Sequence, residues 1–537
     1  MSLGDRMPGW PALRALRWSD EQARAYYEAG YWEPLGMYDH FAAHAARTPQ
    51  KLAYSDGTTE LTFAELCRRS TSLGGALLDA GLEPGDIVLV RLHNSVDYVV
   101  ALVGLAAAGL VAYHMAADTN SPGLISGIGR TEARAAIVEE PMSEEERDAL
   151  TAPTLVITTA VHAPGTLPFA DLLAAPRDDL PPQDPDAVAN LIPTSGTTGT
   201  PKLVMRSVNC SLAMARSLSE RGMLSAEDTL LVGAPLSGGV GFFNGIGVGA
   251  LYGNTTIVAP DLKPDSMLEL ASRTRATRIA TLPTVVTRMA TAETLGEMDL
   301  SALRGVQTGG AFMRPEMGEK IERDLGCRLT IIFGSVDVGS VAMTSFEEPD
   351  PERRFGTVGQ LLTGAEGAIV DPRGNQLPPG EVGEIVMRGP DTALGYFDDP
   401  EATAQVFDDE GWGHFGDLAV FDEEGYARIV GRLKEIINRG GRKISVLEVE
   451  TAVGEWDVVR DVAAVGYPDD DLGERCAVFV VTQDGAEVDL EQLRAHLEAH
   501  GTGKWMWPER IVCVEALPVS QSGKVKRDEL RARLVAG

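Results

Sequence analysis

The sequence predicts an α/β protein with a large N-terminal domain of doubly wound sheets, a small β-barrel-like subdomain and a small α+β C-terminal domain. From Leu61 onward, short apolar stretches alternate with stretches of helical period, an order typical of a mainly parallel sheet with helices on both faces. Beyond Thr357, short alternating stretches and turn sequences such as 371–374 indicate a β-rich subdomain. After Arg432 the pattern changes again, to a compact mixture of helices and strands.

These changes in pattern set the expected domain boundaries. A chain of 537 residues is long enough for more than one domain. Residues 1–35 are rich in Trp, Tyr, Arg and Pro, and we expect them to form an arm over the main body. The large domain is expected at 36–431, with its β-rich subdomain at about 357–431, and the C-terminal domain at 432–537.

Composition and charge argue against several classes of protein. Apolar residues make up 44% of the chain and charged residues 23%, as in soluble globular proteins. The formal net charge of −31 argues against nucleic acid or an anionic membrane as a partner. The N-terminus lacks the basic and then apolar order of a signal peptide. The sequence has no CxxC spacing, so neither a zinc site nor a disulfide framework is indicated. A reduced, cytoplasmic setting fits the five cysteines, which are Cys67, Cys210, Cys327, Cys476 and Cys513.

The first elements of the main body follow from caps and apolar runs. A helix is expected at 63–78, because Thr62 and Glu65 have the spacing of a capping box. The stretch 99–117 is nearly long enough to span a bilayer, but its Ala and Gly content and His114 favour a buried helix and strand. Further elements expected in this half are strands at 87–92, near 111, at 135–138 and at 154–158, and a helix from Val96.

The second half of the large domain continues the alternation. The stretch 238–249 is rich in glycine, and an isolated helix of this composition would be weak. We expect its glycines to permit close packing or to line a pocket. Ligands of doubly wound sheets bind where the strands end in turns, so the strand ends mark the candidate site. The expected strands are 189–192, 230–232, 256–258, 278–282, 305–308 and 329–332.

The stretch from Thr194 to Lys202 reads Thr-Ser-Gly-Thr-Thr-Gly-Thr-Pro-Lys. Its glycines let several backbone N–H groups converge, and its hydroxyls and lysine supply further donors to a polyanion. A plain Ser/Thr/Gly linker has a similar composition, and the lysine does not stand where the nucleotide-binding P-loop has it. The order of residues resembles the phosphate-binding signature of the adenylate-forming superfamily, which includes acyl- and aryl-CoA synthetases, nonribosomal adenylation domains and luciferases.

Further short motifs follow in the order of that superfamily. Alone, each is modest: a Gly-Asp pair is typical of a turn, and Lys524 alone would be a solvated surface lysine. Together they extend the resemblance over about residues 40–530, and segment 26–32 resembles the opening of aryl-acid and alicyclic-acid ligases. The motifs are Gly309-Gly310-Ala311, Phe333-Gly334-Ser335-Val336-Asp337, Gly416-Asp417, Gly431-Arg432 and Gly523-Lys524.

The resemblance implies an enzyme that uses ATP and Mg²⁺ to convert a carboxylic acid into an acyl-adenylate, and then transfers the acyl group to CoA. Lys524 would neutralise the α-phosphate, Asp417 would bind the ribose hydroxyls, and Phe333 would lie on the adenine. The C-terminal domain would be mobile about the hinge Lys434, bringing Gly440 and Gly441 beside the pantetheine thiol. The implied ATP- or AMP-binding residues are Thr194, Ser195, Gly196, Thr197, Thr198, Gly199, Lys202, Gly309, Gly310, Ala311, Phe333, Gly334, Ser335, Asp417 and Arg432.

Two departures from the family pattern affect the expected chemistry. The usual magnesium ligand is Glu, and this chain has Asp337, so the metal must come nearer or bind through water, which would slow adenylation. Members that bind 2-hydroxybenzoate carry Asn where this chain has Gly239, which disfavours that substrate. The expected acyl pocket is small-walled and apolar and favours a bulky cyclic or aryl acid: Gly239, Phe242, Phe243, Gly310, Gly334 and Val338.

Alternative functions stay open at this point. The acyl acceptor is either CoA or the phosphopantetheine of an acyl carrier protein. A further alternative is that the enzyme performs only thioester formation from a supplied acyl-adenylate, because Asp337 has impaired the first step. A catalytically inactive nucleotide-binding protein is a further alternative, against which the retention of Lys524 argues. The identity of the acid and the possibility of a homodimer are also open.

Overall fold

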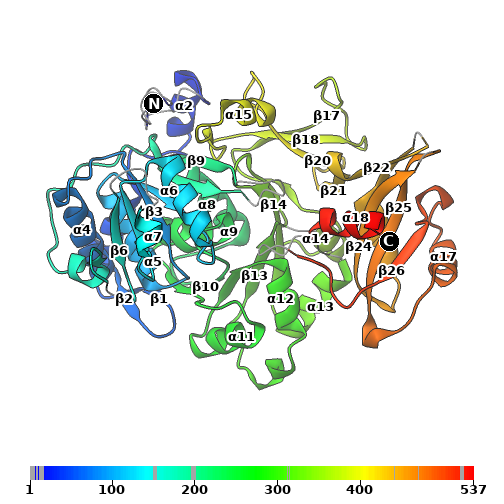
Figure 1. The fold of residues 1–537 in the computed structure, drawn as a ribbon, viewed down its shortest axis with the longest axis horizontal. Helices are drawn as coiled ribbons and strands as arrows, with labels where there is room; N and C mark the ends of the chain where they lie inside the picture. The colour runs from blue at the N-terminus through cyan, green and yellow to red at the C-terminus, as the bar shows by residue number, and fades with distance from the viewer. Residues whose placement is uncertain are drawn as a thin grey trace. The chain divides into compact units, whose positions relative to one another are not determined.

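A computed structural model of the protein describes residues 7, 10, 17–148, 154–161, 163–194, 201–310, 313, 315–440, 442–469, 471–519 and 525–536 (Figure 1). The chain divides into two compact units. The domain boundaries expected at 36, 357 and 432 stay predictions. Unit 1 consists of Met1–Phe355, Gly359–Glu366 and Met387–Gly413, and unit 2 of Gly356–Val358, Gly367–Val386 and His414–Gly537.

An eight-stranded sheet, drawn mainly in blue and cyan in Figure 1, lies in unit 1 in the order β19-β9-β8-β4-β3-β5-β6-β7. The strands from β8 to β7 are parallel, β9 pairs antiparallel with β8, and the edge strand β19 pairs antiparallel with β9. The strands expected in this region are confirmed. Their bounds are β3 Ile87–Arg91, β4 Val111–His114, β5 Ala135–Val138, β6 Leu155–Thr158, β7 Leu167–Pro168, β8 Val188–Pro193, β9 Leu203–Ser207 and β19 Gly395–Tyr396.

A nine-stranded sheet in unit 1 has the order β16-β15-β14-β13-β12-β10-β11-β1-β2. Its strands from β14 to β1 are parallel, and antiparallel strands close both edges. The doubly wound architecture expected from the sequence is therefore confirmed. The bounds are β1 Leu52–Ser55, β2 Glu60–Thr62, β10 Thr229–Gly233, β11 Thr255–Val258, β12 Arg278–Thr281, β13 Gly305–Gly309, β14 Arg328–Ser335, β15 Gly339–Met343 and β16 Gln360–Leu361.

Helix α8 contacts β8 and β9 of one sheet and β15 of the other, and apolar side chains of both sheets share one core. Helices α12 and α13 pack on β13 and β14. The helices of unit 1 are α2 Asp20–Glu28, α3 Met37–Arg47, α4 Phe63–Asp79, α5 Val96–Ala107, α6 Ser121–Thr131, α7 Glu144–Asp148, η2 Phe169–Leu173, α8 Val208–Gly222, α9 Gly239–Phe242, η3 Phe243–Gly247, α10 Val248–Tyr252, α11 Pro264–Arg273, α12 Pro283–Ala290, η4 Glu293–Glu297, α13 Pro315–Leu325, α14 Pro351–Gly356 (whose last residue is in unit 2) and α15 Pro400–Val406.

Two local predictions are confirmed at the level of single residues. The Glu65 carboxylate accepts from the Thr62 N–H at 2.9 Å and the Thr62 hydroxyl accepts from the Glu65 N–H at 3.3 Å, so the capping box starts α4 as expected. The apolar stretch 99–117 contains the buried helix α5 and the buried strand β4. Within the described part of the chain, no helix is both long and apolar enough to cross a membrane.

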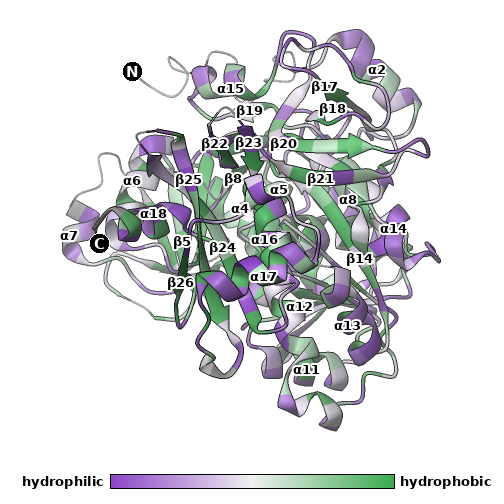
Figure 2. Ribbon diagram, turned by 90° about the vertical axis from the view of Figure 1, so that its right-hand side faces the viewer, coloured by the Kyte–Doolittle hydropathy of each residue, from purple (hydrophilic) through white to green (hydrophobic). Residues whose placement is uncertain are grey.

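Unit 2 contains most of a four-stranded sheet, β17-β18-β20-β21, and a five-stranded sheet, β23-β22-β25-β24 with β26 beside β25. Figure 2 shows mainly hydrophobic strands, whereas α17 carries many hydrophilic residues. The β-rich texture expected after residue 357 is therefore present. The bounds are β17 Glu366–Val370, β18 Gly383–Arg388, β20 Gly413–Phe421, β21 Ala427–Arg432, η5 Leu433–Glu435, β22 Ile436–Arg439, β23 Arg442–Ser445, α16 Val446–Gly454, β24 Val459–Asp469, β25 Gly473–Thr482, η6 Gln483–Gly485, α17 Leu490–Ala499, η7 Lys504–Met506, β26 Arg510–Cys513 and α18 Arg527–Ala536.

Candidate active site

The expected phosphate loop joins the antiparallel strands β8 and β9 of unit 1. At its base the Thr194 N–H donates to the Lys202 carbonyl at 2.9 Å, and the pairing of Pro193 with Leu203 continues the ladder. Both ends of the loop are therefore fixed by the sheet. Ser195, Gly196, Thr197, Thr198 and Gly199 lie outside the described residues, so their expected contacts stay predictions.

Lys202 is held beside an aromatic ring from a distant part of the chain. Its ammonium lies 4.8 Å from the ring centroid of Tyr396, close enough for a cation–π interaction. Tyr396 belongs to β19, which pairs with β9 so that Tyr396 faces Val204. Because Val204 is only two residues beyond Lys202, the sheet fixes the lysine and the ring relative to each other.

Asp337 lies in the turn between β14 and β15. The Ser335 hydroxyl and the Val338 N–H, the latter at 2.9 Å, donate to its Oδ1, and the Tyr396 hydroxyl donates to its Oδ2. Burial and the neighbouring Asp337 carboxylate raise the pKa of Tyr396, so the phenol keeps its proton and remains a donor. The half-buried carboxylate is therefore held in one orientation by three donors.

The strand before this turn is longer than expected. The prediction ended it at Ile332, but β14 continues to Ser335 and pairs Gly334 with Ser340. Phe333, Gly334 and Ser335 are therefore strand residues, and the turn itself is 336–338. A Cβ at Gly334 would lie 2.6 Å from the Gly339 carbonyl oxygen, so the close approach of the two strands requires glycine at this position.

The Asp337 carboxylate fits a magnesium ion bound together with a nucleotide. From the described residues, Oδ1 accepts two hydrogen bonds and Oδ2 accepts one, which leaves a lone pair on Oδ2 for a cation. In the described part of the chain, no three His, Cys, Asp or Glu side chains gather as a metal site. Mg²⁺ commonly takes one or two carboxylates and completes its shell with phosphate oxygens and water. A single aspartate therefore suffices.

The Gly-Gly-Ala motif begins at the end of β13. A Cβ at Gly309 would lie 2.3 Å from the Ile332 side chain, so this glycine lets β13 and β14 pack closely. Gly310 has φ +90° and no neighbouring atom within 4 Å of an added Cβ, so it combines a glycine conformation with open space. Ala311 lies outside the described residues.

The expected acyl-pocket residues at 239, 242 and 243 lie in a short helical segment, α9 and the π-helical turn η3. Phe242 and Phe243 are buried, and the rings of Phe242 and His114 pack in a T-shaped arrangement with 5.0 Å between centroids. A Cβ at Gly239 would lie 2.5 Å from Val336 Cγ2, so Val336 occupies the space that a side chain there would take. By contrast, Val338 is buried with its side chain against Gly413.

The glycine-rich stretch 238–249 is helical, contrary to what its propensity suggests. Tertiary packing overrides propensity here, because the glycines permit approaches that a Cβ would block. At Gly241 an added Cβ would lie 2.0 Å from the Pro235 carbonyl oxygen, and at Gly249 it would lie 2.4 Å from the Tyr54 hydroxyl. The prediction that these glycines allow close packing is confirmed.

Arg206 is a buried residue of this region that stands in no recognisable motif of the sequence. Its guanidinium donates to the backbone carbonyls of Val336 at 2.5 Å, Asp391 at 2.7 Å and Cys210 at 2.8 Å, and it lies 4.8 Å from the ring centroid of Phe243. It is fully buried. Arg206 therefore ties the turn that carries Asp337 to β9, α8 and the segment before β19.

Tyr396 and Val336 were also missed as site residues. Tyr396 is 59 residues from Asp337 along the chain, and no spacing rule connects them. Val336 was noted only as a member of the motif. The available signals were a tyrosine flanked by Gly395 and Phe397 and a valine beside an acidic residue, both of which occur in ordinary strands.

In unit 2, the structure brings together the two residues expected to contact ribose and phosphate. Asp417 and Arg432 face each other on β20 and β21, and Arg432 Nε donates to Asp417 Oδ1 at 2.6 Å. Burial disfavours the charged guanidinium, but Asp417 outweighs it and raises the pKa of Arg432. The pair therefore forms one fixed group with a buried carboxylate and a half-exposed guanidinium.

The expected hinge and pantetheine residues also belong to unit 2. Lys434 lies in the short helical turn η5 directly after β21. Gly440 has φ +56° in the turn between β22 and β23, and its N–H donates to the Leu472 carbonyl at 2.8 Å. Gly441 and Lys524 lie outside the described residues. Their roles, and that of the hinge, stay predictions.

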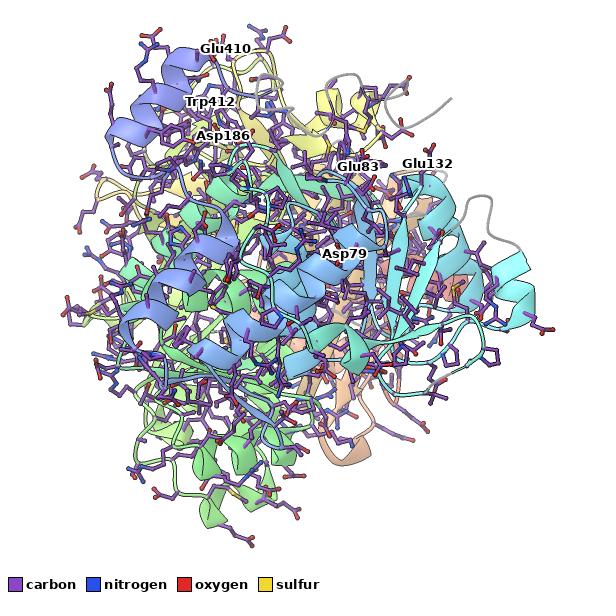
Figure 3. All side chains as sticks on the ribbon, turned by 90° about the vertical axis from the view of Figure 1, so that its left-hand side faces the viewer. Asp79, Glu83, Glu132, Asp186, Glu410 and Trp412 are labelled. Atoms are coloured by element: carbon purple, nitrogen blue, oxygen red, sulfur yellow. The ribbon has the colours of Figure 1, made fainter. Side chains whose placement is uncertain are left out.

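Acidic side chains are spread over one face of unit 1. Figure 3 labels Asp79, Glu83, Glu132, Asp186 and Glu410 on this face. Two of these carboxylates have partners: Asp79 pairs with the Arg177 guanidinium at 2.7 Å, and Asp186 accepts from the Tyr27 hydroxyl at 2.9 Å.

Family models match both parts of this arrangement. The model described as AMP-binding enzyme matches residues 41–397, which include the loop, the Asp337 turn and Tyr396. The chain belongs to the AMP-binding enzyme family. The model described as AMP-binding enzyme C-terminal domain matches residues 448–524. The resemblance to the adenylate-forming superfamily is thereby confirmed.

This AMP-binding enzyme is similar along its whole length to curated aryl-acid ligases. A 2-hydroxy-7-methoxy-5-methyl-1-naphthoate–CoA ligase of Streptomyces carzinostaticus is 31% identical, with 96% of each chain covered. A salicylyl-CoA synthase/salicylate adenylyltransferase of a Streptomyces species is 33% identical, again with 96% of each chain covered. Among solved structures, the amide bond synthetase McbA of Marinactinospora thermotolerans is 28% identical with a TM-score of 0.82, over 93% of this chain and 99% of that one.

Proposed function

We propose that this AMP-binding enzyme is an acid–thiol ligase that activates a bulky cyclic or aryl carboxylic acid with ATP and transfers the acyl group to CoA. One observation carries the proposal. The lysine that ends the phosphate loop and the candidate metal ligand Asp337 converge on one side chain, Tyr396. A loop for phosphates beside an oriented carboxylate is suited to a nucleotide bound with a divalent cation.

The chemistry follows from the need for a better leaving group on the acid. A carboxylate oxygen of the acid bonds to the α-phosphorus of ATP, and the bond to the bridging oxygen breaks, releasing pyrophosphate. The CoA sulfur then bonds to the carbonyl carbon, the thiol proton leaves, and AMP departs with the shared oxygen. AMP is a much weaker base than oxide, so the second displacement becomes favourable.

Charge stabilisation on the phosphates is assigned to residues around the loop. Lys202 and the loop hydroxyls and N–H groups bind the β- and γ-phosphates, and Lys524 approaches the α-phosphate. Mg²⁺, bound with ATP at Asp337, supplies further positive charge to the phosphate oxygens. Asp417 accepts from the ribose hydroxyls with Arg432 beside it. Motion about Lys434 then replaces Lys524 with the segment of Gly440 and Gly441 for the thiol step.

The walls beside Gly239 support an acid that is bulky and apolar next to its carboxyl group. Val336 and Phe243 are the nearest side chains to an added Cβ at Gly239, and neither offers a hydrogen bond. The two Streptomyces relatives are named for 2-hydroxyaryl acids. We infer a related cyclic or aryl acid whose 2-position is not recognised through a hydrogen bond from residue 239.

Acyl acceptors other than CoA are compatible with the same first half-reaction. A carrier-protein phosphopantetheine is the principal alternative, and the similarity to an amide bond synthetase adds an amine as a third acceptor. Thioester formation alone, from a supplied acyl-adenylate, is favoured only if Asp337 cannot support adenylation.

The test is pyrophosphate release from ATP and Mg²⁺ with a panel of aryl, alicyclic and short linear acids, followed by addition of CoA. We expect release with at least one bulky ring acid, and a CoA thioester and AMP after CoA is added. Pyrophosphate release without a CoA thioester, but with acylation of a carrier protein or an amine, would show that this group is the acyl acceptor instead of CoA. An enzyme that releases no pyrophosphate yet converts supplied acyl-adenylates would contradict the first step.

A further inference from the structure

Tyr396 contacts the functional groups of two separate motifs. Its hydroxyl donates to Asp337 Oδ2 at the end of β14, and its ring lies under the Lys202 ammonium at the end of the phosphate loop. The side chain is only 4% exposed, so both contacts are shielded from water.

The position of Tyr396 is itself fixed from both sides. The strand β19 pairs with β9, which begins at the residue after Lys202. On the other side, the Tyr396 N–H donates to the Thr403 hydroxyl of α15 at 2.9 Å. The backbone of Tyr396 is therefore anchored by contacts other than those that its side chain makes with Lys202 and Asp337.

The Tyr396 hydroxyl donates to Oδ2, the oxygen of Asp337 that is available to bind a cation. Among donors from the described part of the chain, Ser335 and the Val338 N–H fill Oδ1 of Asp337, whereas Oδ2 accepts from Tyr396 and keeps one lone pair. Groups that hydrogen-bond a ligating carboxylate fix its orientation and strengthen metal binding. An aspartate reaches less far than the glutamate usual in the superfamily, so its orientation matters more here.

We propose that Tyr396 is a positioning residue for the adenylation half-reaction: its hydroxyl orients Asp337 toward Mg²⁺ and its ring holds Lys202 beside the triphosphate. The inference rests on the proposed function. Tyr396 acts through its contacts with Asp337 and Lys202. Its effect is confined to ATP with its metal, because the thioester half-reaction starts from an adenylate without β- and γ-phosphates.

The variants Tyr396→Phe and Tyr396→Leu separate the two contacts. Phenylalanine keeps the ring beside Lys202 and removes the hydroxyl, and leucine removes both. The matched control is Tyr27→Phe, which removes a hydroxyl that donates to another carboxylate, Asp186, at 2.9 Å in the N-terminal arm. All three proteins and the wild type are compared at equal concentration, with thermal unfolding as the check on folding.

We expect Tyr396→Phe to raise the half-saturating Mg²⁺ concentration for pyrophosphate release about tenfold, as for other partners of metal ligands. Tyr396→Leu should in addition raise the KM for ATP. Thioester formation from a supplied acyl-adenylate should match the wild type in both variants, and Tyr27→Phe should match it in every assay. Equilibrium binding of ATP with and without Mg²⁺ gives a second readout: the metal should strengthen binding less in Tyr396→Phe than in the wild type.

Two results would overturn the role of Tyr396. One is an unchanged Mg²⁺ dependence of ATP binding in Tyr396→Phe. The other is an equal loss in both half-reactions, which would indicate a general structural role. If the wild type binds ATP with Mg²⁺ but no acid gives pyrophosphate, the proposed function fails while the binding comparison still decides the role of Tyr396. If the wild type binds no ATP, both proposals fail.

Discussion

The side chain of Asp337 places a carboxylate among three donors, and its charge is the property that the first half-reaction needs. Asp337→Asn keeps the shape and removes the charge. We expect pyrophosphate release to fall roughly 100-fold, because both the metal ligand and its charge are lost. Thioester formation from a supplied acyl-adenylate should stay within about threefold of the wild type. Separate assays of the two half-reactions measure this, and parallel losses would refute the assignment.

The Val336 side chain occupies the space that a side chain at position 239 would take, and the energetic coupling of the two positions can be measured. Gly239→Ala puts a Cβ 2.5 Å from Val336 Cγ2 and should cost about 1–3 kcal/mol of stability. In the double variant with Val336→Ala the clash disappears, so the two single effects should fail to add by at least about 1 kcal/mol. Urea unfolding of the four proteins provides the cycle. Additive effects would show that the two residues do not compete for this space.

Asp391 gives a pH dependence of stability that can be assigned to one group. Burial raises its pKa from 3.8 to about 6, against the opposing effects of the Ser340 N–H and the Arg206 guanidinium. Between about pH 4 and 6 the folded protein keeps the proton that the unfolded chain has lost. The stability contribution of this group therefore falls as pH rises through this window and stays constant above it.

The variant Asp391→Asn removes this titration. Its stability relative to the wild type should rise by up to about 3 kcal/mol between pH 4 and pH 6.5. Urea unfolding at several pH values within this range measures the difference. A constant offset between the two proteins across the window would show that Asp391 ionises normally in the folded state.

At the scale of single residues, the sequence predicts motifs better than partners. The sequence indicates three site residues because each belongs to a short motif and the motifs follow in the order of the superfamily: Asp337, Asp417 and Arg432. Tyr396 could not, since its role depends on the pairing of β19 with β9, and the sequence does not specify that pairing. For Arg206 the reason is different. Its hydrogen bonds go to three backbone carbonyls, which every residue has and which therefore leave no mark in a sequence pattern.

At the scale of elements, the helix built from 238–249 depends on glycine for its position. Gly241→Ala would place a Cβ 2.0 Å from the Pro235 carbonyl oxygen, and the backbone cannot move aside as a flexible side chain would. We expect a loss of about 3 kcal/mol. The matched control is Gly296→Ala in η4, where an added Cβ meets nothing within 4 Å. It should leave stability unchanged or raise it by about 0.5 kcal/mol, because alanine restricts the unfolded chain.

Chemical denaturation of the two variants and the wild type checks this prediction. Equal effects at positions 241 and 296 would mean that helix propensity, and not the contact with Pro235, governs the segment. The difference between local propensity and contacts with neighbouring elements also explains which elements could be predicted. Parallel strands appear as short apolar runs, and α4 has its capping box in the sequence. The π-helical turn η3 and the extension of β14 to Ser335 depend on neighbours that propensity does not include.

At the scale of the whole molecule, ligand binding should raise stability in proportion to how well the acid fits. A ligand that binds only the folded state stabilises it by mass action. With ATP and Mg²⁺ present, a suitable ring acid should raise the Tm by several degrees, whereas acetate should leave it at the value seen with ATP and Mg²⁺ alone. A panel of acids in a thermal-shift assay measures this. An equal response to acetate would contradict the proposed bulky pocket.

Arg206 also bears on any attempt to give this enzyme the specificity of a relative. Its guanidinium connects the strand after the phosphate loop, the turn with Val336 and the segment at Asp391, three stretches far apart in the chain. Grafting one of these stretches from a homologue would leave the arginine with a mismatched backbone. Recombination should therefore exchange all three stretches together, or leave all three in place and vary only Gly239 and the phenylalanines.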